Sequence, residues 1–209
     1  MLRRGGLMDN LYDVKIDGVG KLNGGKYKDI KISGVGTILS NIEGQKVNID
    51  GVGEIKGSVK CNELAVEGTL SCSGGVDVGE KVNVNGMLTV NGNLQGREVF
   101  CDGYLKVKGL LSADKVVLIA QGKNKIAEIG GEEITIKVIK RGIMDGLFFS
   151  NKLVSDSIEG DTISLENTIC KIVRGHNIKI NKGCTIDRVE YTGELVVDEN
   201  AKIKESIKL

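Results

Sequence analysis

One stretch of the chain has the spacing of a phosphate-binding loop. Residues Gly20 to Tyr27 fit the pattern G-x-x-x-x-G-K, in which backbone N–H groups and a lysine hold phosphate oxygens. Tyr27 stands where a serine or threonine hydroxyl would bind Mg²⁺, and no helical pattern follows whose N-terminus would face the phosphates. We therefore interpret this stretch as a turn of a repeat and expect no nucleotide site.

The single histidine could act as a general base in acyl transfer. His176 lies in the sequence Arg174-Gly175-His176-Asn177, where a neighbouring glycine is typical of a solvated corner. We interpret it as a corner residue and keep the catalytic role as an alternative.

Five cysteines could serve as thiolate nucleophiles or metal ligands. They form no C-x-x-C pair, and their odd number argues against a complete set of disulfides. Two of them stand where other copies of the repeat described below have valine or isoleucine. We expect all five to be reduced, buried and small apolar residues: Cys61, Cys72, Cys101, Cys170 and Cys184.

Carboxylates recur about one repeat apart and could form a ladder that holds Ca²⁺. They lie beside glycines at Asp17, Asp50, Glu67 and Asp102. Ser33 and Asn85 occupy the same position in other copies, so the shared requirement is a polar residue that favours a turn. We predict no catalytic residue, no cofactor-binding residue and no metal site.

The composition favours a thin, uniform interior. The 209 residues include 30 glycines, no proline, no tryptophan and only 3% aromatic residues, whereas a globular core normally uses large rings to fill its centre. The 29 basic and 28 acidic residues leave a net charge of +1. This balance attracts no polyanion, so we expect no nucleic acid as a partner.

A repeat of 17 or 18 residues dominates the chain, with four near-copies in succession between Val47 and Lys115. Such a period indicates a solenoid. Each copy opens with aliphatic residues at i and i+2, a strand periodicity, and then has a polar residue and a glycine, which is turn chemistry that admits positive φ. The structural corner glycines are Gly18, Gly34, Gly51, Gly68, Gly86 and Gly103.

A finer period of six residues predicts how the strands are arranged. Two series of apolar residues recur every six positions, one from Leu64 to Leu94 and one from Val66 to Val90. Three sixes make one turn of an all-β, three-sided parallel β-helix whose turns stack ~4.8 Å apart. An antiparallel meander would leave strands of about four residues, shorter than usual. Spacing alone leaves the handedness open.

The repeat divides the chain into four parts. Residues 1–11 form an N-terminal arm that we expect to be disordered, and residues 12–141 form the first part of the β-helix. Residues 142–152 break the pattern as a loop or hairpin that either folds back over the coil or offers an interaction patch of Leu147, Phe148 and Phe149. Residues 153–209 resume the coil, with a slightly longer step.

The repeat pattern resembles that of the bactofilins, the bacterial polymer-forming cytoskeletal proteins. The stretch that carries the resemblance is VNIDGVGEIKGSVKCNELAVEGTLSCSG. The stretch IEGDTISLENTICKIVRGHNIKINKGCTIDRVEYTG is similar to the second half of a longer, clostridia-like variant. The resemblance implies a right-handed three-sided β-helix that polymerises without nucleotide into non-polar filaments or sheets. It also implies a scaffold at the membrane, with the membrane surface or cell-envelope proteins as partners.

The chain shows neither an apolar run of about 18 residues nor a signal-peptide core. We therefore expect a cytoplasmic protein that, if the resemblance holds, lies peripherally at the inner face of the membrane.

Three functions remain in competition. We favour end-to-end self-assembly, because neither end of the sequence offers a helix to cap the open strand edges of a β-helix. The second is a left-handed β-helix acyltransferase with His176 as its base. The third is a monomeric adaptor whose 142–151 loop caps the coil.

Overall fold

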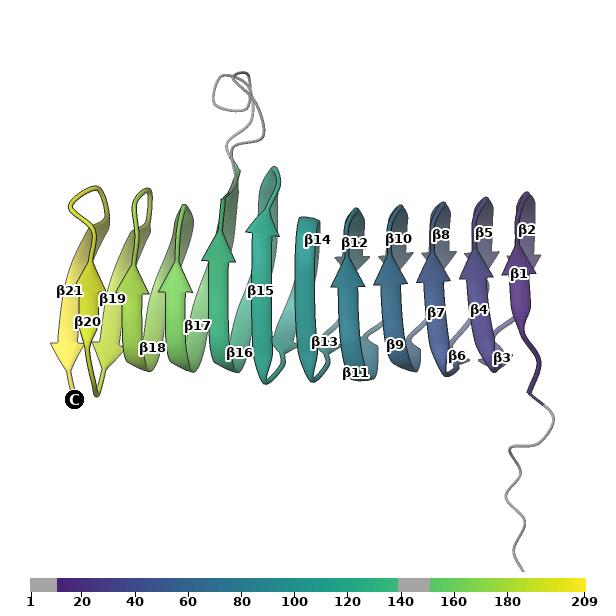
Figure 1. Ribbon diagram of the computed structural model, residues 1–209, viewed down its shortest axis with the longest axis horizontal. Coiled ribbons are helices and arrows are strands. Elements are labelled where there is room, and N and C mark those ends of the chain that lie inside the picture. The colour runs from purple at the N-terminus through teal and green to yellow at the C-terminus, as the bar shows by residue number, and fades with distance from the viewer. Residues whose placement is uncertain (1–10, 139–150) are drawn as a thin grey trace, which may run out of the picture.

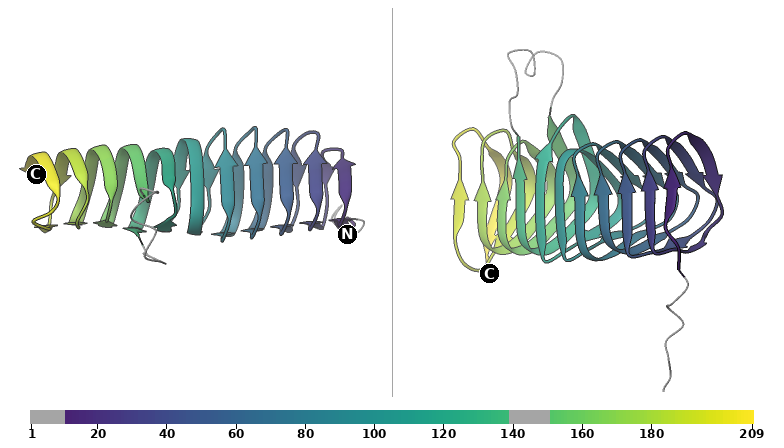
Figure 2. Two further views of the ribbon diagram at one scale, coloured as in Figure 1. Left: turned by 90° about the horizontal axis from the view of Figure 1, so that it is seen from above. Right: turned by 45° about the vertical axis from the view of Figure 1, so that its right-hand side comes forward.

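The computed structural model describes residues 11–138 and 151–209. These residues form 21 strands and no helix, and the strands pair in parallel to make a β-solenoid of about eleven turns (Figures 1 and 2). In Figure 1 the near strands point upward, the chain returns behind them, and the coil advances from the N-terminal turn at the right to the left. The coil is therefore right-handed, and the predicted fold class is confirmed.

The strands up to β8 have two to four residues, and from β9 onward several longer strands run round the corners of the coil. Their bounds are β1 Val14–Ile16, β2 Val19–Leu22, β3 Gly25–Lys26, β4 Asp29–Ile32, β5 Val35–Ile38, β6 Ile42–Glu43, β7 Lys46–Ile49, β8 Val52–Ile55, β9 Val59–Val66, β10 Thr69–Cys72, β11 Val76–Val84, β12 Met87–Val90, β13 Leu94–Gln95, β14 Glu98–Ser112, β15 Lys115–Ala120, β16 Lys123–Lys137, β17 Lys152–Leu165, β18 Thr168–Ile180, β19 Thr185–Tyr191, β20 Leu195–Val197 and β21 Lys202–Lys208.

Three ladders of parallel pairs form the three sides of the coil. The first side begins with β1, β4 and β7, the second with β2, β5 and β8, and the third with β3, β6 and β9. Equivalent residues of successive turns lie in direct register, as Val14 does with Ile30 and Ile30 with Val47. Each position of the repeat therefore forms a column along the coil.

The columns that point inward make one continuous apolar core. The two predicted six-residue series are at most 2% exposed, and they belong to this core. Burying each such side chain contributes about 1.5–3 kcal/mol. The predicted longer step in the last part is wrong: Ile163 pairs with Ile178 only 15 residues later.

The corner glycines between the first and second sides stack on one another. A Cβ at Gly34, Gly51, Gly68, Gly86 or Gly103 would lie 2.0–2.2 Å from the carbonyl oxygen of the glycine one turn earlier. Positive φ does not explain them, because the described glycines with positive φ are Gly25, Gly122 and Gly183. Close approach of the backbones of successive turns, not a special backbone conformation, requires glycine here.

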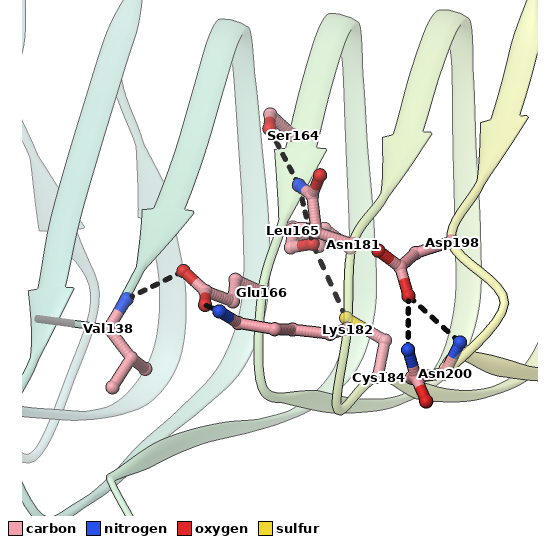
Figure 3. A network of polar contacts seen from close by, with 9 residues as sticks. All are labelled: Val138, Ser164, Leu165, Glu166, Asn181, Lys182, Cys184, Asp198 and Asn200. Carbon is pink, nitrogen blue, oxygen red and sulfur yellow. Dashed lines mark hydrogen bonds and ion pairs between the residues drawn. The ribbon is translucent and has the colours of Figure 1, made fainter. Parts of the chain in front are cut away.

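The last turns build their corners differently. A glycine column stands between the third and first sides at Gly131, Gly160 and Gly175, each 2.3–2.5 Å from a backbone oxygen of the preceding turn when a Cβ is added. The corner between the first and second sides instead has polar side chains, which Figure 3 shows. There Asn181 donates hydrogen bonds to the Ser164 hydroxyl (3.2 Å) and the Leu165 carbonyl (3.1 Å).

The interruption falls at this same corner. Strand β16 ends at Lys137 on the first side, and β17 begins at Lys152 on the second. A Glu166 carboxylate oxygen accepts a hydrogen bond from the backbone N–H of Val138 (3.1 Å), which ties the end of the first part to the next turn (Figure 3). The predicted patch of Leu147, Phe148 and Phe149, and the predicted arm up to residue 10, lie outside the described residues.

The stacked glycines give a test of the corner. Replacing Gly51 with alanine puts a methyl group 2.1 Å from the Gly34 oxygen, whereas no atom lies within 4 Å of a Cβ at Gly18. We expect Gly51→Ala to cost about 1–3 kcal/mol and to lower the melting temperature by roughly 3–10 °C for a chain of this size. Gly18→Ala should leave it almost unchanged in thermal unfolding followed by circular dichroism. Equal shifts for both variants would contradict the steric explanation.

Candidate functional site: the two terminal turns

The two ends of the described coil carry strands that pair on one side only. Strands β1, β2 and β3 pair with β4, β5 and β6, while β20 and β21 pair with β18 and β19. Within residues 11–138 and 151–209, no further strand covers the opposite edges. Each end therefore presents backbone N–H and C=O groups that can template another strand.

The N-terminal turn also presents apolar side chains. Val14, Ile16 and Leu22 point inward and pack against the core, yet they are only partly buried because no described turn lies beyond them. Beside them Tyr12, 63% exposed, meets the buried Tyr27 edge to face at 5.6 Å. This end is an apolar surface framed by the edges of three strands.

The C-terminal turn repeats this arrangement. Leu195 and Ile203 are partly buried against the core, and Val197 is 44% exposed although its register partner Ile180 is fully buried. Val196 is equally exposed, at 45%, but it pairs with the outward-facing Lys179. The register therefore places Val197 on the end surface and Val196 on a side of the coil.

Charges near both ends are paired within the chain. At the N-terminal end Lys15 lies 2.8 Å from Asp17. At the C-terminal end Lys204 lies 2.6 Å from Asp187, one turn earlier. Each of these two lysines therefore has a carboxylate within its own chain.

His176 borders a shallow groove of about 830 Å³ on the third side. The glycine column of Gly131, Gly160 and Gly175 lines it. The His176 Nδ1 lies 2.9 Å from the hydroxyl of Thr192, and the ring is exposed. The candidate base thus contacts a threonine hydroxyl, and not a carboxylate that would orient the ring for catalysis.

A carboxylate in this groove is held by two arginines. The side chain of Glu190 is only 12% exposed, and its oxygens lie 2.6 Å from the Arg174 Nε and 2.7 Å from an Arg188 nitrogen. The hydrogen bond from Arg174, aided by the charge of Arg188, lowers the pKa of Glu190. The pair of arginines therefore keeps Glu190 ionised and fixes it between two turns.

The predicted carboxylate column is distributed among separate partners. Asp17 pairs with Lys15, and Asp50 lies 2.9 Å from Lys31. Glu67 accepts a hydrogen bond from Asn85, and Asp102 accepts one from Gln121. In the part of the chain that the structure describes, no three His, Cys, Asp or Glu side chains gather as metal ligands would.

The phosphate-loop candidate is part of the first turn of the coil. Residues 19–22 are strand β2 and residues 25–26 are strand β3. Lys26 lies 2.8 Å from Glu43 of the next turn, and Tyr27 is buried with its hydroxyl donating to the Asn23 carbonyl. These side chains are engaged in stacking the turns.

Across the described residues, no helix is long and apolar enough to cross a membrane.

Comparison with known proteins finds two relatives, each of which matches just under half of the chain. Uncharacterized protein YhbF of Bacillus subtilis (strain 168) is 38% identical over 105 residues, which are 48% of this chain and 42% of that protein. Uncharacterized protein YhbE of the same organism is 35% identical over 106 residues, 49% of this chain and 44% of that protein. The matched part thus spans less than half of each relative. No family model and no solved structure matches the chain.

The buried cysteines give a test that separates structural thiols from catalytic ones. Burial raises the pKa of Cys61, Cys72, Cys101 and Cys170 to about 12 and that of Cys184 to about 11. Because the thiolate is the reactive form, we expect the folded protein at pH 8 to react with Ellman's reagent at least ~100-fold more slowly than the unfolded protein. Unfolding in guanidinium should release five thiols. One thiol that reacts rapidly in the folded protein would identify a nucleophile and argue against a purely structural role.

Proposed function

We propose that this protein is a self-assembling structural scaffold that polymerises end to end without nucleotide, and that it is not an enzyme. A β-solenoid is compatible with a structural scaffold. One observation favours end-to-end polymerisation over the acyltransferase and adaptor hypotheses. Both terminal turns of the described coil combine uncovered strand edges with partly exposed core side chains. A second copy stacked on either end would cover both features at once.

The magnitudes make such stacking feasible. The last turn pairs with its predecessors through nine residue pairs, three in β20 and six in β21. If a stacked copy forms a similar number of backbone hydrogen bonds, each with a net contribution of about 0.5–1.5 kcal/mol, they contribute roughly 5–14 kcal/mol. Association costs about 4–15 kcal/mol in lost freedom. Backbone pairing therefore only balances the cost, and burial of the apolar end side chains decides whether polymers form.

Like ends that pair about a twofold axis would alternate head-to-head and tail-to-tail contacts along an unlimited filament. Such a filament has no polarity and needs no energy source. The similarity of the repeat cadence to the bactofilins supports the same arrangement. It also motivates the remaining parts of the proposal, a cytoplasmic location at the inner face of the membrane and membrane or cell-envelope partners.

Two adjacent valines test the contribution of the C-terminal end. We expect Val197→Lys to place a charge on the apolar end surface and to abolish polymers or raise the concentration needed for them at least ~10-fold. Val196→Lys, which adds the same charge on a side of the same strand, should polymerise like the unmodified protein. The measurement is negative-stain electron microscopy of untagged protein without nucleotide, together with sedimentation over a range of concentrations.

The unmodified protein provides the decisive control. A monomer at all concentrations would contradict the proposed function and favour the adaptor hypothesis. If both valine variants polymerise with the concentration dependence of the unmodified protein, the C-terminal end surface takes no part in the polymer contact.

A further inference from the structure

An apolar column runs along the outside of the second side through the first six turns. Its members each follow a corner glycine directly in the sequence, and each is in register with the next. Four of them are large apolar residues with exposed fractions between 43% and 89%. The apolar column consists of Val19, Val35, Val52, Thr69, Met87 and Tyr104.

The other outward column of this side carries little charge. It consists of Lys21, Thr37, Glu54, Ser71, Thr89 and Lys106. Only three of the twelve outward positions of the second side are thus charged in these turns. Seven of the twelve residues are valine, threonine or serine, so most of the face consists of short side chains.

The other two sides are strongly charged over the same turns. On the first side Lys46 lies 2.8 Å from Glu63, and on the third side Lys26 lies 2.8 Å from Glu43. The hydrogen bond from Lys46 to Glu63 raises the pKa of Lys46. Charged side chains that pair between neighbouring turns lie on both of these sides, so the second side differs from them in chemistry and not only in position.

The face has a definite end. In the next two turns of the second side, Lys123 and Lys152 stand in register with each other at the positions that would continue the apolar column. The apolar column is therefore confined to the first six turns, although the neighbouring outward column continues with Val154, Ile169 and Thr185.

We propose that this face packs against the same face of a second copy and joins filaments side by side. The inference rests on the proposed function, because it concerns copies already joined end to end. The apolar column offers one side chain every ~4.8 Å, and only a surface with the same repeat can match each of them. A second copy turned about a twofold axis has that repeat and the same low density of charge.

The size of the face explains why polymerisation must come first. Six turns at ~4.8 Å and a four-residue strand at ~3.3 Å per residue give roughly 380 Å² per copy, or about 760 Å² for a pair. A stable interface buries about 1,200 Å² or more. Single copies are therefore expected to pair only weakly through this face, whereas filaments that repeat it along their length pair by multivalency.

The same features make a membrane the weaker occupant. Surfaces that bind an anionic bilayer combine basic residues with large side chains such as Trp, Phe and Leu. Here most members of the apolar column are short, and Glu54 lies on the face together with only two lysines. The chemistry fits a flat β-sheet surface better than a lipid headgroup layer.

Charge added to this face tests the inference separately from end-to-end growth. In the double variant Val35→Lys/Val52→Lys, both changes fall on outward residues that are 48% and 50% exposed. We expect filaments that still form but remain single, at half the width of the paired filaments of the unmodified protein. The matched control is Asn48→Lys/Ala65→Lys, which adds two charges to register neighbours on the first side and should leave pairing intact.

Each other result overturns the inference in a recognisable way. Single filaments of the unmodified protein would overturn lateral pairing while end-to-end growth stands. A double valine variant without filaments, alongside a normal control, would show that this face acts in end-to-end growth instead. If the unmodified protein and the control cosediment with phosphatidylglycerol vesicles and the double valine variant does not, the face binds a membrane. An unmodified protein that stays monomeric would overturn the proposed function and the inference together.

Discussion

The close approach of successive turns at the corners is the contact on which the rest of the structure depends. In the first six turns the glycine column lets each corner backbone lie directly against the carbonyl of the turn before it. Because the turns then stack in register, the repeat positions on the sides form columns, and the register shifts only locally, as between Val78 and Lys81 and between Val107 and Leu110. An inward column needs only residues of one size, so a core of Val, Ile and Leu suffices without the tryptophan that a globular centre would normally use.

Most of this fold could be predicted from the sequence, because period, alternation and glycine position all point to the same solenoid. The apolar residues that recur every six positions from Leu64 to Leu94 are buried, as their spacing requires. The reason for the corner glycines could not be predicted, since a polar–glycine pair reads equally well as a turn with positive φ. The move of the glycine column to Gly131, Gly160 and Gly175 was also missed, because longer strands there replace the short polar–glycine phrases.

The candidate site was harder to predict because it depends on register. Whether Val196 or Val197 belongs to the end surface follows from the pairing of Val197 with Ile180, which the sequence of one strand does not reveal. The apolar column did leave a signal, an apolar residue or threonine after each corner glycine. A single exposed valine is ordinary, however, and only the register places six such positions in one line despite steps that vary from 16 to 18 residues.

The repeat that builds the coil also selects what the coil can bind. On the first and third sides, lysines pair with carboxylates of neighbouring turns, as Lys46 does with Glu63 and Lys26 with Glu43, so these charges are largely satisfied within one molecule. The end turns also expose apolar core side chains, the second side carries only three charged residues among its twelve outward positions, and both repeat the spacing of the coil itself. A surface with that spacing is matched best by another copy of the same coil. The proposed self-association would therefore follow directly from the solenoid repeat.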